Sequence, residues 1–362
     1  MKFDGRTACL PTVEMTQAFL FCTVESNAIL GWVWKAAIKS IRTSQNPGHS
    51  RMGKTIDPAP LITVITPTHN RRDQVVRAVE SVLAQSLTQF EHIVVDDGST
   101  DATAAALAAI RDPRLVYVGA KWRGANAARN AGIERARAPI VAFLDSDDVY
   151  LPDRLERTLA RFDENPSLEI LISSFVSVKG GRSTKCVNRE AFLTRSSLEK
   201  ALVGQAIFIA GSAITARRES LLAIGGYDSD IARMQDRELL LRFARRSGAL
   251  LSEDIDWKKY NSENSISGRR DGYVEAYANL IDKHPYIADR YPDVPPYMIA
   301  RQIIADAMKG RVSQAFAGYL ANRSSKALGY SLPQLLRGYV GGRRWRRDLY
   351  DEFREKYGTR PA

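Results

Sequence analysis

Strand and helix patterns alternate regularly along residues 61–144, and this alternation constrains the fold more than any other feature of the chain. Residues 61–66 form a β-branched, apolar run of the kind that a fully buried parallel strand requires. Similar runs at 90–95, 114–118 and 140–144 are separated by stretches with helical periodicity. Strands that alternate with helices in this way predict βαβ units, and therefore an α/β fold whose mostly parallel sheet is flanked by helices.

The length of 362 residues allows one large domain with an appendage. Residues 1–57 lack sustained periodicity and are predicted to be a poorly defined N-terminal extension; whether residues 1–51 belong to the functional protein is left open. The α/β domain is predicted to span residues 58–265, and the region 266–362 is mainly helical in pattern. No segment reaches the roughly 18 consecutive apolar residues that a membrane helix needs.

The charge of the chain is unevenly distributed. The net charge is +11, and residues 301–362 alone carry 13 Lys/Arg against 5 Asp/Glu. This basic C-terminal region is predicted to be either a solvated helix face or a peripheral contact with an anionic membrane; nucleic acid is not the expected partner. The 3 cysteines are far apart and the 4 histidines form no metal-binding pattern, which argues against a disulfide framework or a zinc site and favours a cytoplasmic location.

Acidic residues follow two of the predicted strands. Asp96 and Asp97 end the second, whereas Asp145, Asp147 and Asp148 end the fourth. Ligands of parallel α/β sheets bind at the carboxyl ends of the strands, so both clusters are expected in one crevice. In an extended segment residues i and i+2 face the same way, so Asp145 and Asp147 could share a Mg²⁺ or Mn²⁺ ion with substrate phosphates. The alternative is a polar turn that caps the next helix.

Residues 48–55 match the phosphate-binding pattern G-x-x-x-x-G-K-[ST], but their context argues against this function. A P-loop needs a buried strand before it and a helix after it. The preceding residues 44–47 are polar, and two prolines in 56–60 oppose a regular helix. The fingerprint G-x-G-x-x-G is absent after the first predicted strand, which disfavours enzymes that use nicotinamide cofactors.

Four segments carry the pattern that suggests a function: residues 67–71, 96–101, 124–132 and 145–148. Their order and spacing resemble the family-2 inverting nucleotide-sugar glycosyltransferases, which have the GT-A fold. The resemblance covers about residues 60–250. It implies a GT-A fold with a mixed, mostly parallel sheet flanked by helices, followed by a helical C-terminal appendage.

The resemblance also implies roles on the donor side. Asp97 is expected to bind the nucleotide base or ribose while Asp96 supports the turn, and Asp145 is expected near the ribose. Arg129 is either a cation near the phosphates or a helix-surface arginine paired with an acid. Asp148 is expected to be structural. The predicted nucleotide-sugar-binding residues are Pro67, Thr68, His69, Asn70, Arg71, Asp96, Asp97, Arg129, Asp145 and Ser146, and the predicted ligand of Mg²⁺ or Mn²⁺ is Asp147.

An inverting transferase needs a base that takes a proton from the attacking hydroxyl group of the acceptor. By resemblance this base is Asp236, with Glu238 and Asp228 as the next choices. Gln235 replaces the first acid of the family's usual pair, and residues 260–265 lack the histidine that many relatives carry there. The metal is therefore expected to lack a protein ligand on that side.

The predicted function is metal-dependent, inverting transfer of a sugar from a nucleotide-sugar, preferably a UDP-sugar, to a glycan or lipid-linked acceptor. The expected setting is surface polysaccharide or lipopolysaccharide biosynthesis in the cytoplasm, with possible contact at the inner face of the membrane. The first alternative is a nucleotidyltransferase acting on sugar phosphates, and the second is nucleic-acid binding through the basic residues 343–347. The donor sugar, the linkage and the oligomeric state stay open.

Overall fold

The computed structural model describes residues 59–121, 123–260 and 272–357. All of these residues belong to one compact unit. The predicted extension 1–57, which contains the P-loop-like match, lies outside the described residues. The predicted boundary between residues 265 and 266 falls within the segment 261–271, which also lies outside them, so this boundary stays a prediction.

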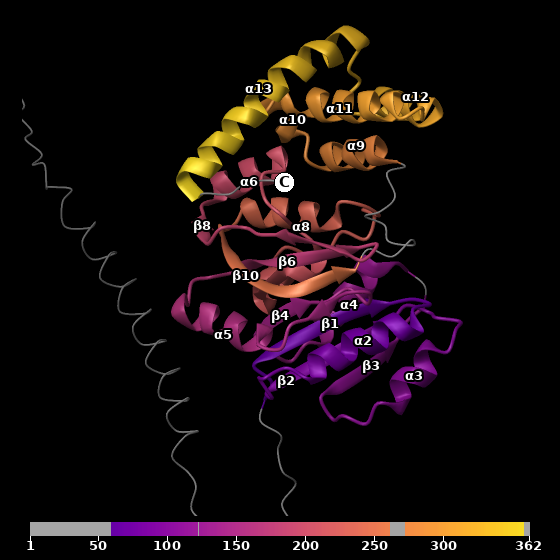
Figure 1. The fold of residues 1–362 in the computed structure, drawn as a ribbon, viewed down its shortest axis with the longest axis vertical. Helices are drawn as coiled ribbons and strands as arrows, with labels where there is room; N and C mark the ends of the chain where they lie inside the picture. The colour runs from indigo at the N-terminus through magenta and orange to yellow at the C-terminus, as the bar shows by residue number, and fades with distance from the viewer. Residues whose placement is uncertain (1–58, 122, 261–271, 358–362) are drawn as a thin grey trace, which may run out of the picture. The chain divides into compact units, whose positions relative to one another are not determined.

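The described residues contain ten strands in one sheet (Figure 1). They are β1 (Ile62–Thr68), β2 (Phe90–Asp96), β3 (Leu115–Gly119), β4 (Ile140–Phe143), β5 (Val149–Tyr150), β6 (Ile170–Lys179), β7 (Arg182–Cys186), β8 (Ala191–Leu193), β9 (Ile214–Arg217) and β10 (Ala249–Tyr260). The strand order is β3-β2-β1-β4-β9-β6-β10-β5, with β7 paired to β6 and β8 paired to β10.

The sheet has a parallel half and a mixed half. Strands β3, β2, β1 and β4 are parallel to one another, as the alternating pattern predicts. Strand β9 runs antiparallel between β4 and β6, whereas β10 is parallel to β6. Every residue of β1 and β2 is buried because helices cover both faces, which explains their nearly continuous apolar character. The predicted fold class, a mixed α/β sheet flanked by helices, is confirmed.

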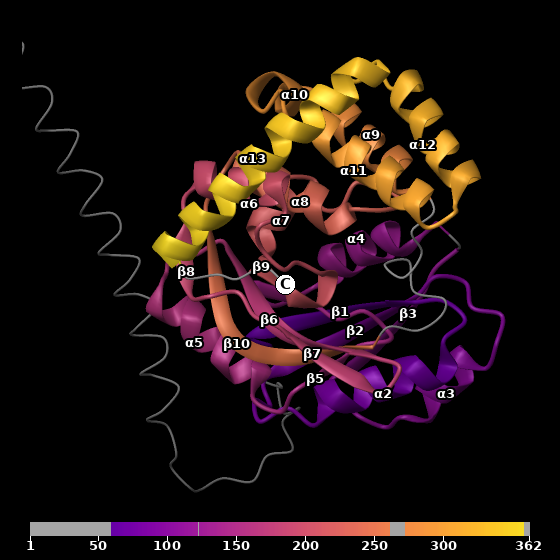
Figure 2. The same cartoon turned by 45° about the horizontal axis from the view of Figure 1, so that its top comes forward.

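Helices cover both faces of this sheet. They are α2 (Arg72–Leu83), α3 (Thr103–Ala109), α4 (Ala125–Arg135), α5 (Arg154–Glu164), α6 (Arg195–Gly204), α7 (Arg218–Ala223) and α8 (Gln235–Ala244), with a short 3-10 helix η1 (Gly211–Ala213). Figure 2 shows α2 and α3 on one face, and α4 and α8 on the other. Helix α4 lies close to β1 because Gly132 has no side chain; a Cβ there would lie 2.5 Å from Ile65 Cγ2.

The C-terminal helices lie on the side of α6 and α8 (Figure 1). They are α9 (Tyr273–Lys283), α10 (Tyr286–Arg290), α11 (Val294–Met308), α12 (Val312–Ser324) and α13 (Leu332–Tyr357). Arg346 Nε donates to Gly204 O at 3.2 Å and Tyr350 Oη donates to Gln205 O at 3.1 Å, so part of the predicted basic cluster 343–347 fixes α13 to α6. None of the helices in the described range is both long enough and apolar enough to cross a bilayer.

Candidate functional site

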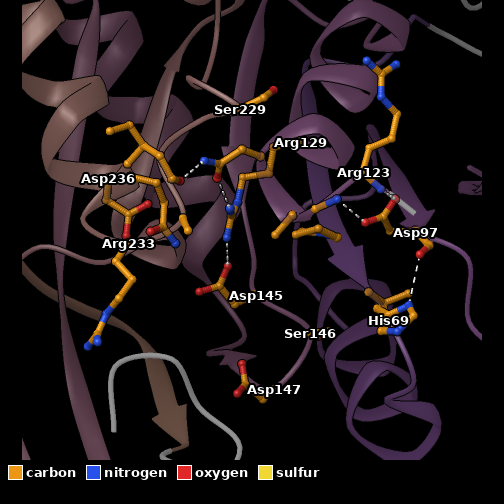
Figure 3. Close-up of a pocket in the computed structure, with 18 of the residues that line it drawn as sticks. His69, Asp97, Arg123, Arg129, Asp145, Ser146, Asp147, Ser229, Arg233 and Asp236 are labelled. Atoms are coloured by element: carbon orange, nitrogen blue, oxygen red, sulfur yellow. Dashed lines mark hydrogen bonds and ion pairs between the residues drawn. The ribbon is translucent and has the colours of Figure 1, made fainter. Parts of the chain in front are cut away.

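A cavity of about 710 Å³ opens at the carboxyl ends of β1, β2 and β4. It brings together the four segments that are separated in sequence, together with the start of α8. Figure 3 shows Asp97 and His69 on one side of this cavity, Asp236 on the other and Asp145 between them. The predicted site residues that line it are Pro67, Thr68, His69, Arg71, Asp97, Arg129, Asp145, Ser146, Asp147 and Asp236.

Asp97 holds the loop that precedes α4. Its two carboxylate oxygens accept the backbone N–H groups of Arg123 at 2.9 Å and Gly124 at 2.7 Å. Gly124 has a φ of 93°, a conformation that side chains disfavour. His69 Nδ1 lies 3.0 Å from Asp97 O and donates to it, since a carbonyl oxygen can only accept. His69 therefore makes a backbone contact, and binding of a base or ribose by Asp97 stays a prediction.

Asn70 and Asp96 support the neighbouring turns and do not line the cavity. Asn70 has a φ of 50°, and its Oδ1 accepts from the backbone N–H of Thr100 at 2.7 Å. The Asn70 backbone N–H donates to Ser99 Oγ at 2.8 Å. Asp96 accepts from the Ser99 backbone N–H at 2.9 Å and from Tyr117 Oη at 3.0 Å. These bonds join the ends of β1 and β2, so both residues shape the cavity from outside it.

Arg129 is a buried member of the site. Its Nη2 donates to Asp145 Oδ1 at 2.6 Å, and its Nη1 donates to Asn126 Oδ1 at 3.1 Å. The guanidinium carbon lies 5.1 Å from the centre of the Tyr227 ring. Burial raises the pKa of Asp145, but the charge of Arg129 and then that of Lys259 outweigh it and hold the pKa below its ordinary value. Arg129 is thus paired with an acid, as one interpretation expected, but it does not lie on a helix surface.

Asp147, the predicted metal ligand, lies in the cavity wall beside Arg71. Its Oδ2 lies 3.0 Å from Arg71 Nη1, and its side chain is 12% exposed in the cavity wall. Burial is the main cause that raises the pKa of Asp147. The charge of Arg71 lowers this pKa and that of Asp145 raises it, and the net result lies above the ordinary value. Within the described residues no three His, Cys, Asp or Glu side chains converge on a metal position.

This arrangement fits one kind of metal site. Mg²⁺ is commonly bound by one or two carboxylates while substrate phosphates and water supply its other ligands. A cation would also relieve the unfavourable burial of the Asp147 charge. The donor set therefore fits an ion shared with a diphosphate, and it does not form a preformed protein cage.

Asp148 is structural. It is buried, and it accepts from Ser212 Oγ at 2.6 Å and from the Tyr260 backbone N–H at 3.2 Å. Ser212 Oγ also accepts the Asp145 backbone N–H at 2.9 Å. These bonds connect the acidic segment to η1 and to β10, so Asp148 fixes the orientation of the segment rather than lining the cavity.

Two asparagines of α4 anchor the loop that leads to Asp236. Asn130 accepts the Tyr227 backbone N–H at 2.7 Å and donates to the Tyr227 carbonyl at 2.8 Å. Asn126 Nδ2 donates to the carbonyl groups of Asp228 and Ile231, both at 2.8 Å. Sequence reasoning missed this role. The available signal was their separation by four residues, which places both amides on one helix face.

Asp236 presents its carboxylate to the cavity. Its Oδ1 is shielded from solvent. Burial is the main cause that raises the pKa of Asp236. Gly211 leaves room beside it, because a Cβ at this position would lie 3.3 Å from Asp236 Oδ1 and 3.2 Å from Asp145 Oδ1.

The two fallback acids do not line the cavity. Glu238 is buried in a network in which Arg242 Nη2 donates to it at 2.7 Å and His284 Nε2 lies at 3.2 Å. Asp228 forms an ion pair with Lys283. The structure therefore contradicts the use of either acid as the base in this cavity, because each is turned toward a cation elsewhere.

Lys259 is a cavity residue that sequence reasoning missed. Within the described residues its ammonium group makes no ion pair within 4.0 Å, although it faces a cluster of acids. Burial lowers the pKa of Lys259, but the charges of Asp148, Asp145, Asp147 and Asp236 outweigh this effect and raise it. The expected counterpart of the family's histidine falls in residues 260–265, of which all but Tyr260 lie outside the described residues. Lys259 precedes that segment directly.

Comparison with known proteins agrees with this geometry. The sequence profile of Glycosyl transferase family 2 matches residues 63–225. The chain is 49% identical over 109 residues to the succinoglycan biosynthesis protein ExoO of Rhizobium meliloti, covering 30% of this chain and 31% of that protein. It is 47% identical over 104 residues to the putative teichuronic acid biosynthesis glycosyltransferase TuaG of Bacillus subtilis. This match covers 28% of this chain and 41% of that protein. The matches thus span less than half the length of these two relatives.

The fold is similar to that of a solved structure. The structure of S. aureus TarS residues 1–349 in complex with UDP-GlcNAc superposes with a TM-score of 0.61 at 16% sequence identity. The superposition covers 82% of this chain and 92% of that one. At this identity the similarity concerns the fold alone.

Proposed function

The chain belongs to Glycosyl transferase family 2, and we propose that it transfers a sugar from a nucleotide-sugar, preferably a UDP-sugar, to a glycan or lipid-linked acceptor with inversion at the anomeric carbon. The proposed setting is surface polysaccharide or lipopolysaccharide biosynthesis at the cytoplasmic side of the membrane. The names of the relatives, which refer to succinoglycan and teichuronic acid biosynthesis, support a role in polysaccharide assembly.

The observation that carries the proposal is the position of the Asp236 carboxylate in the cavity wall, beside Asp145. In the proposed reaction this carboxylate accepts the proton of the acceptor hydroxyl group while the hydroxyl oxygen attacks the anomeric carbon. The bond from that carbon to the diphosphate breaks, and its electron pair leaves with the nucleoside diphosphate. A raised pKa makes Asp236 a better proton acceptor than an ordinary carboxylate.

The other side of the cavity supplies positive charge for the leaving group. Asp147 would hold a Mg²⁺ or Mn²⁺ ion, and such an ion neutralises charge on a departing diphosphate when it is bound. Arg71 and Lys259 line the same cavity as fixed cations. Asp145, held by Arg129, is proposed to contact the ribose. Asp97 is proposed to contact the base or ribose at the rim.

The test uses the purified full chain with UDP-, dTDP- and GDP-sugars, Mn²⁺ or Mg²⁺, and a panel of glycan acceptors. Release of nucleoside diphosphate that depends on an acceptor is expected. Asp236→Asn should lower kcat by at least about 100-fold, while donor binding, measured by thermal shift, should remain. The matched control is Asp73→Asn, which changes an exposed acid on α2 and should leave the rate unchanged.

Two results would contradict the proposal. A full transfer rate in Asp236→Asn would exclude this residue as the base. Release of pyrophosphate from a nucleoside triphosphate and a sugar phosphate, without any transfer from nucleotide-sugars, would instead support the nucleotidyltransferase alternative. The anomeric configuration of the product, determined by NMR, tests inversion directly.

A further inference from the structure

Helix α12 carries an exposed apolar stripe. Val312, Phe316 and Leu320 are each more than half exposed, and their spacing of four residues places them along one face of the helix. The other face of α12 is already packed: Ala315 is buried, and a Cβ at Gly318 would lie 3.1 Å from Val274 Cγ2 of α9. The exposed stripe is therefore additional to the face that stabilises the fold.

Helix α13 repeats the pattern. Leu332, Leu336 and Val340 follow one another at the same four-residue spacing, and each is more than half exposed. The opposite face packs on α11, where a Cβ at Gly338 would lie 2.5 Å from Pro296 Cβ. Figures 1 and 2 both show α12 and α13 on the outer side of the helical layer, away from the sheet. We call these six apolar residues and their two helices the α12–α13 surface.

Positive charge predominates around the two apolar stripes. From residue 307 to residue 347 the chain has 9 Lys/Arg and no Asp/Glu. On α13 the exposed face that begins with the apolar stripe continues with Arg343, Arg344 and Arg347, all exposed. Arg347 Nε also lies 3.6 Å from Oδ1 of the exposed Asp348. On α12 the stripe continues with Arg323, which is also exposed. Each helix thus has an apolar line followed by arginine on the same exposed side.

Apolar stripes next to positive charge favour some binding partners of the α12–α13 surface over others. A second copy of the same face would bring like charges together, which disfavours a symmetric dimer through it. A bilayer with anionic lipids satisfies both features, because apolar side chains enter the boundary between headgroups and acyl chains while arginines bind phosphates. We propose that the α12–α13 surface docks the protein on an anionic lipid bilayer. This inference goes beyond the proposed function and does not depend on it.

The test is co-sedimentation of the full chain with vesicles of phosphatidylcholine alone or mixed with phosphatidylglycerol. Binding only to the anionic vesicles is expected, with loss at high salt. Leu336→Gln/Val340→Gln and Val312→Gln/Phe316→Gln should each reduce binding by roughly tenfold or more. Arg343→Gln/Arg344→Gln/Arg347→Gln should reduce it similarly. All seven positions are exposed, and unchanged urea unfolding would show that the fold is kept.

Two matched controls lie elsewhere on the described surface. Phe192→Gln replaces an equally exposed apolar side chain on β8, and Arg182→Gln replaces an exposed arginine on β7. Neither should change vesicle binding. If both apolar double variants still bound anionic vesicles as the wild type does, charge alone would account for the binding. That result would overturn the proposal.

Other outcomes also decide the matter. Absence of binding to anionic vesicles overturns the proposal, and so does self-association that the apolar variants abolish in sedimentation equilibrium, since it would identify a second copy as the occupant. The vesicle experiment needs neither donor nor acceptor. A protein that does not bind vesicles could still transfer sugar, so that result would contradict only the docking proposal. A protein that binds vesicles but transfers no sugar would contradict only the proposed function.

Discussion

Arg129 Nη2 lies 2.6 Å from Asp145 Oδ1, and this ion pair joins helix α4 to the acidic segment that follows β4. The arginine side chain is only 4% exposed, whereas that of Asp145 is 25% exposed. The pair therefore presents a carboxylate of fixed orientation to the cavity, with its counterion buried behind it.

Arg129→Met should destabilise the protein by about 2–3 kcal/mol, because it leaves the Asp145 charge without its partner in a largely desolvated position. The expected loss is below that of a fully buried pair, since a quarter of the Asp145 side chain stays accessible. Urea unfolding measures the change. In a double-mutant cycle with Asp145→Asn, a coupling energy near zero would contradict the importance of the pair.

The activity should rise with pH through the pKa of Asp236, because only the deprotonated carboxylate can accept a proton from the acceptor. Burial raises this pKa above its ordinary value of 3.8, so the acid limb of the profile of kcat/KM should lie above the range of a free aspartate. Asp236→Asn should remove the limb together with most of the activity. If the residual activity of Asp236→Asn kept the same acid limb, the limb would belong to the titration of another group.

Gly211→Ala should impair catalysis more than folding. The added Cβ would lie 3.2 Å from Asp145 Oδ1 and 3.3 Å from Asp236 Oδ1, so both carboxylates would have to shift. A loss of kcat/KM of roughly tenfold or more is expected, since small displacements of reacting groups are costly. Gly119→Ala is the matched control, because its Cβ would make only ordinary contacts at 3.7 Å with Tyr117. Equal activity of the two variants would contradict this explanation.

Lys259→Met should weaken the binding of nucleoside diphosphate by roughly 10- to 100-fold, the usual effect of removing a charge-assisted hydrogen bond. Isothermal titration with the free diphosphate measures this without the transfer reaction. Lys258→Met provides a closely matched control, because Lys258 is the neighbouring residue of β10 but is exposed and does not line the cavity. Equal affinities of both variants would remove Lys259 from the donor site.

Glu238 should stabilise the fold in a pH-dependent manner. Its hydrogen bonds with His284 and Arg242 overcome the effect of burial and lower its pKa from 4.5 to about 2. The folded pKa is thus below the unfolded one, so the contribution is present above about pH 4.5 and is lost as the pH falls toward 2. Its size should be about 2–3 kcal/mol.

This prediction is checked by comparing the unfolding free energies of the wild type and Glu238→Gln between pH 7 and pH 3. The difference should shrink as the pH falls. Glu80→Gln, an exposed change on α2, should show no such trend. A constant difference for Glu238→Gln would mean that the carboxylate charge contributes nothing.

Much of the fold could be predicted from local pattern. The apolar runs that became β1, β2 and β4 are buried between helices, and burial on both faces leaves a signal in every residue of a strand. The antiparallel insertion of β9 between β4 and β6 was not predictable, because it pairs segments far apart in sequence. Its short apolar sequence does not specify a neighbour.

The sequence by itself determined that acids stand at the ends of two strands, the second and the fourth, and the order of the four segments carried the family resemblance. Only the tertiary structure decided which carboxylates face the cavity. It directed Asp236 into the cavity and Glu238 toward Arg242 and His284, although the two residues are separated by one position in the same helix. The physical reason is that helix geometry fixes the direction of each side chain, but the groups it meets are supplied by distant segments such as α4, β10 and α9.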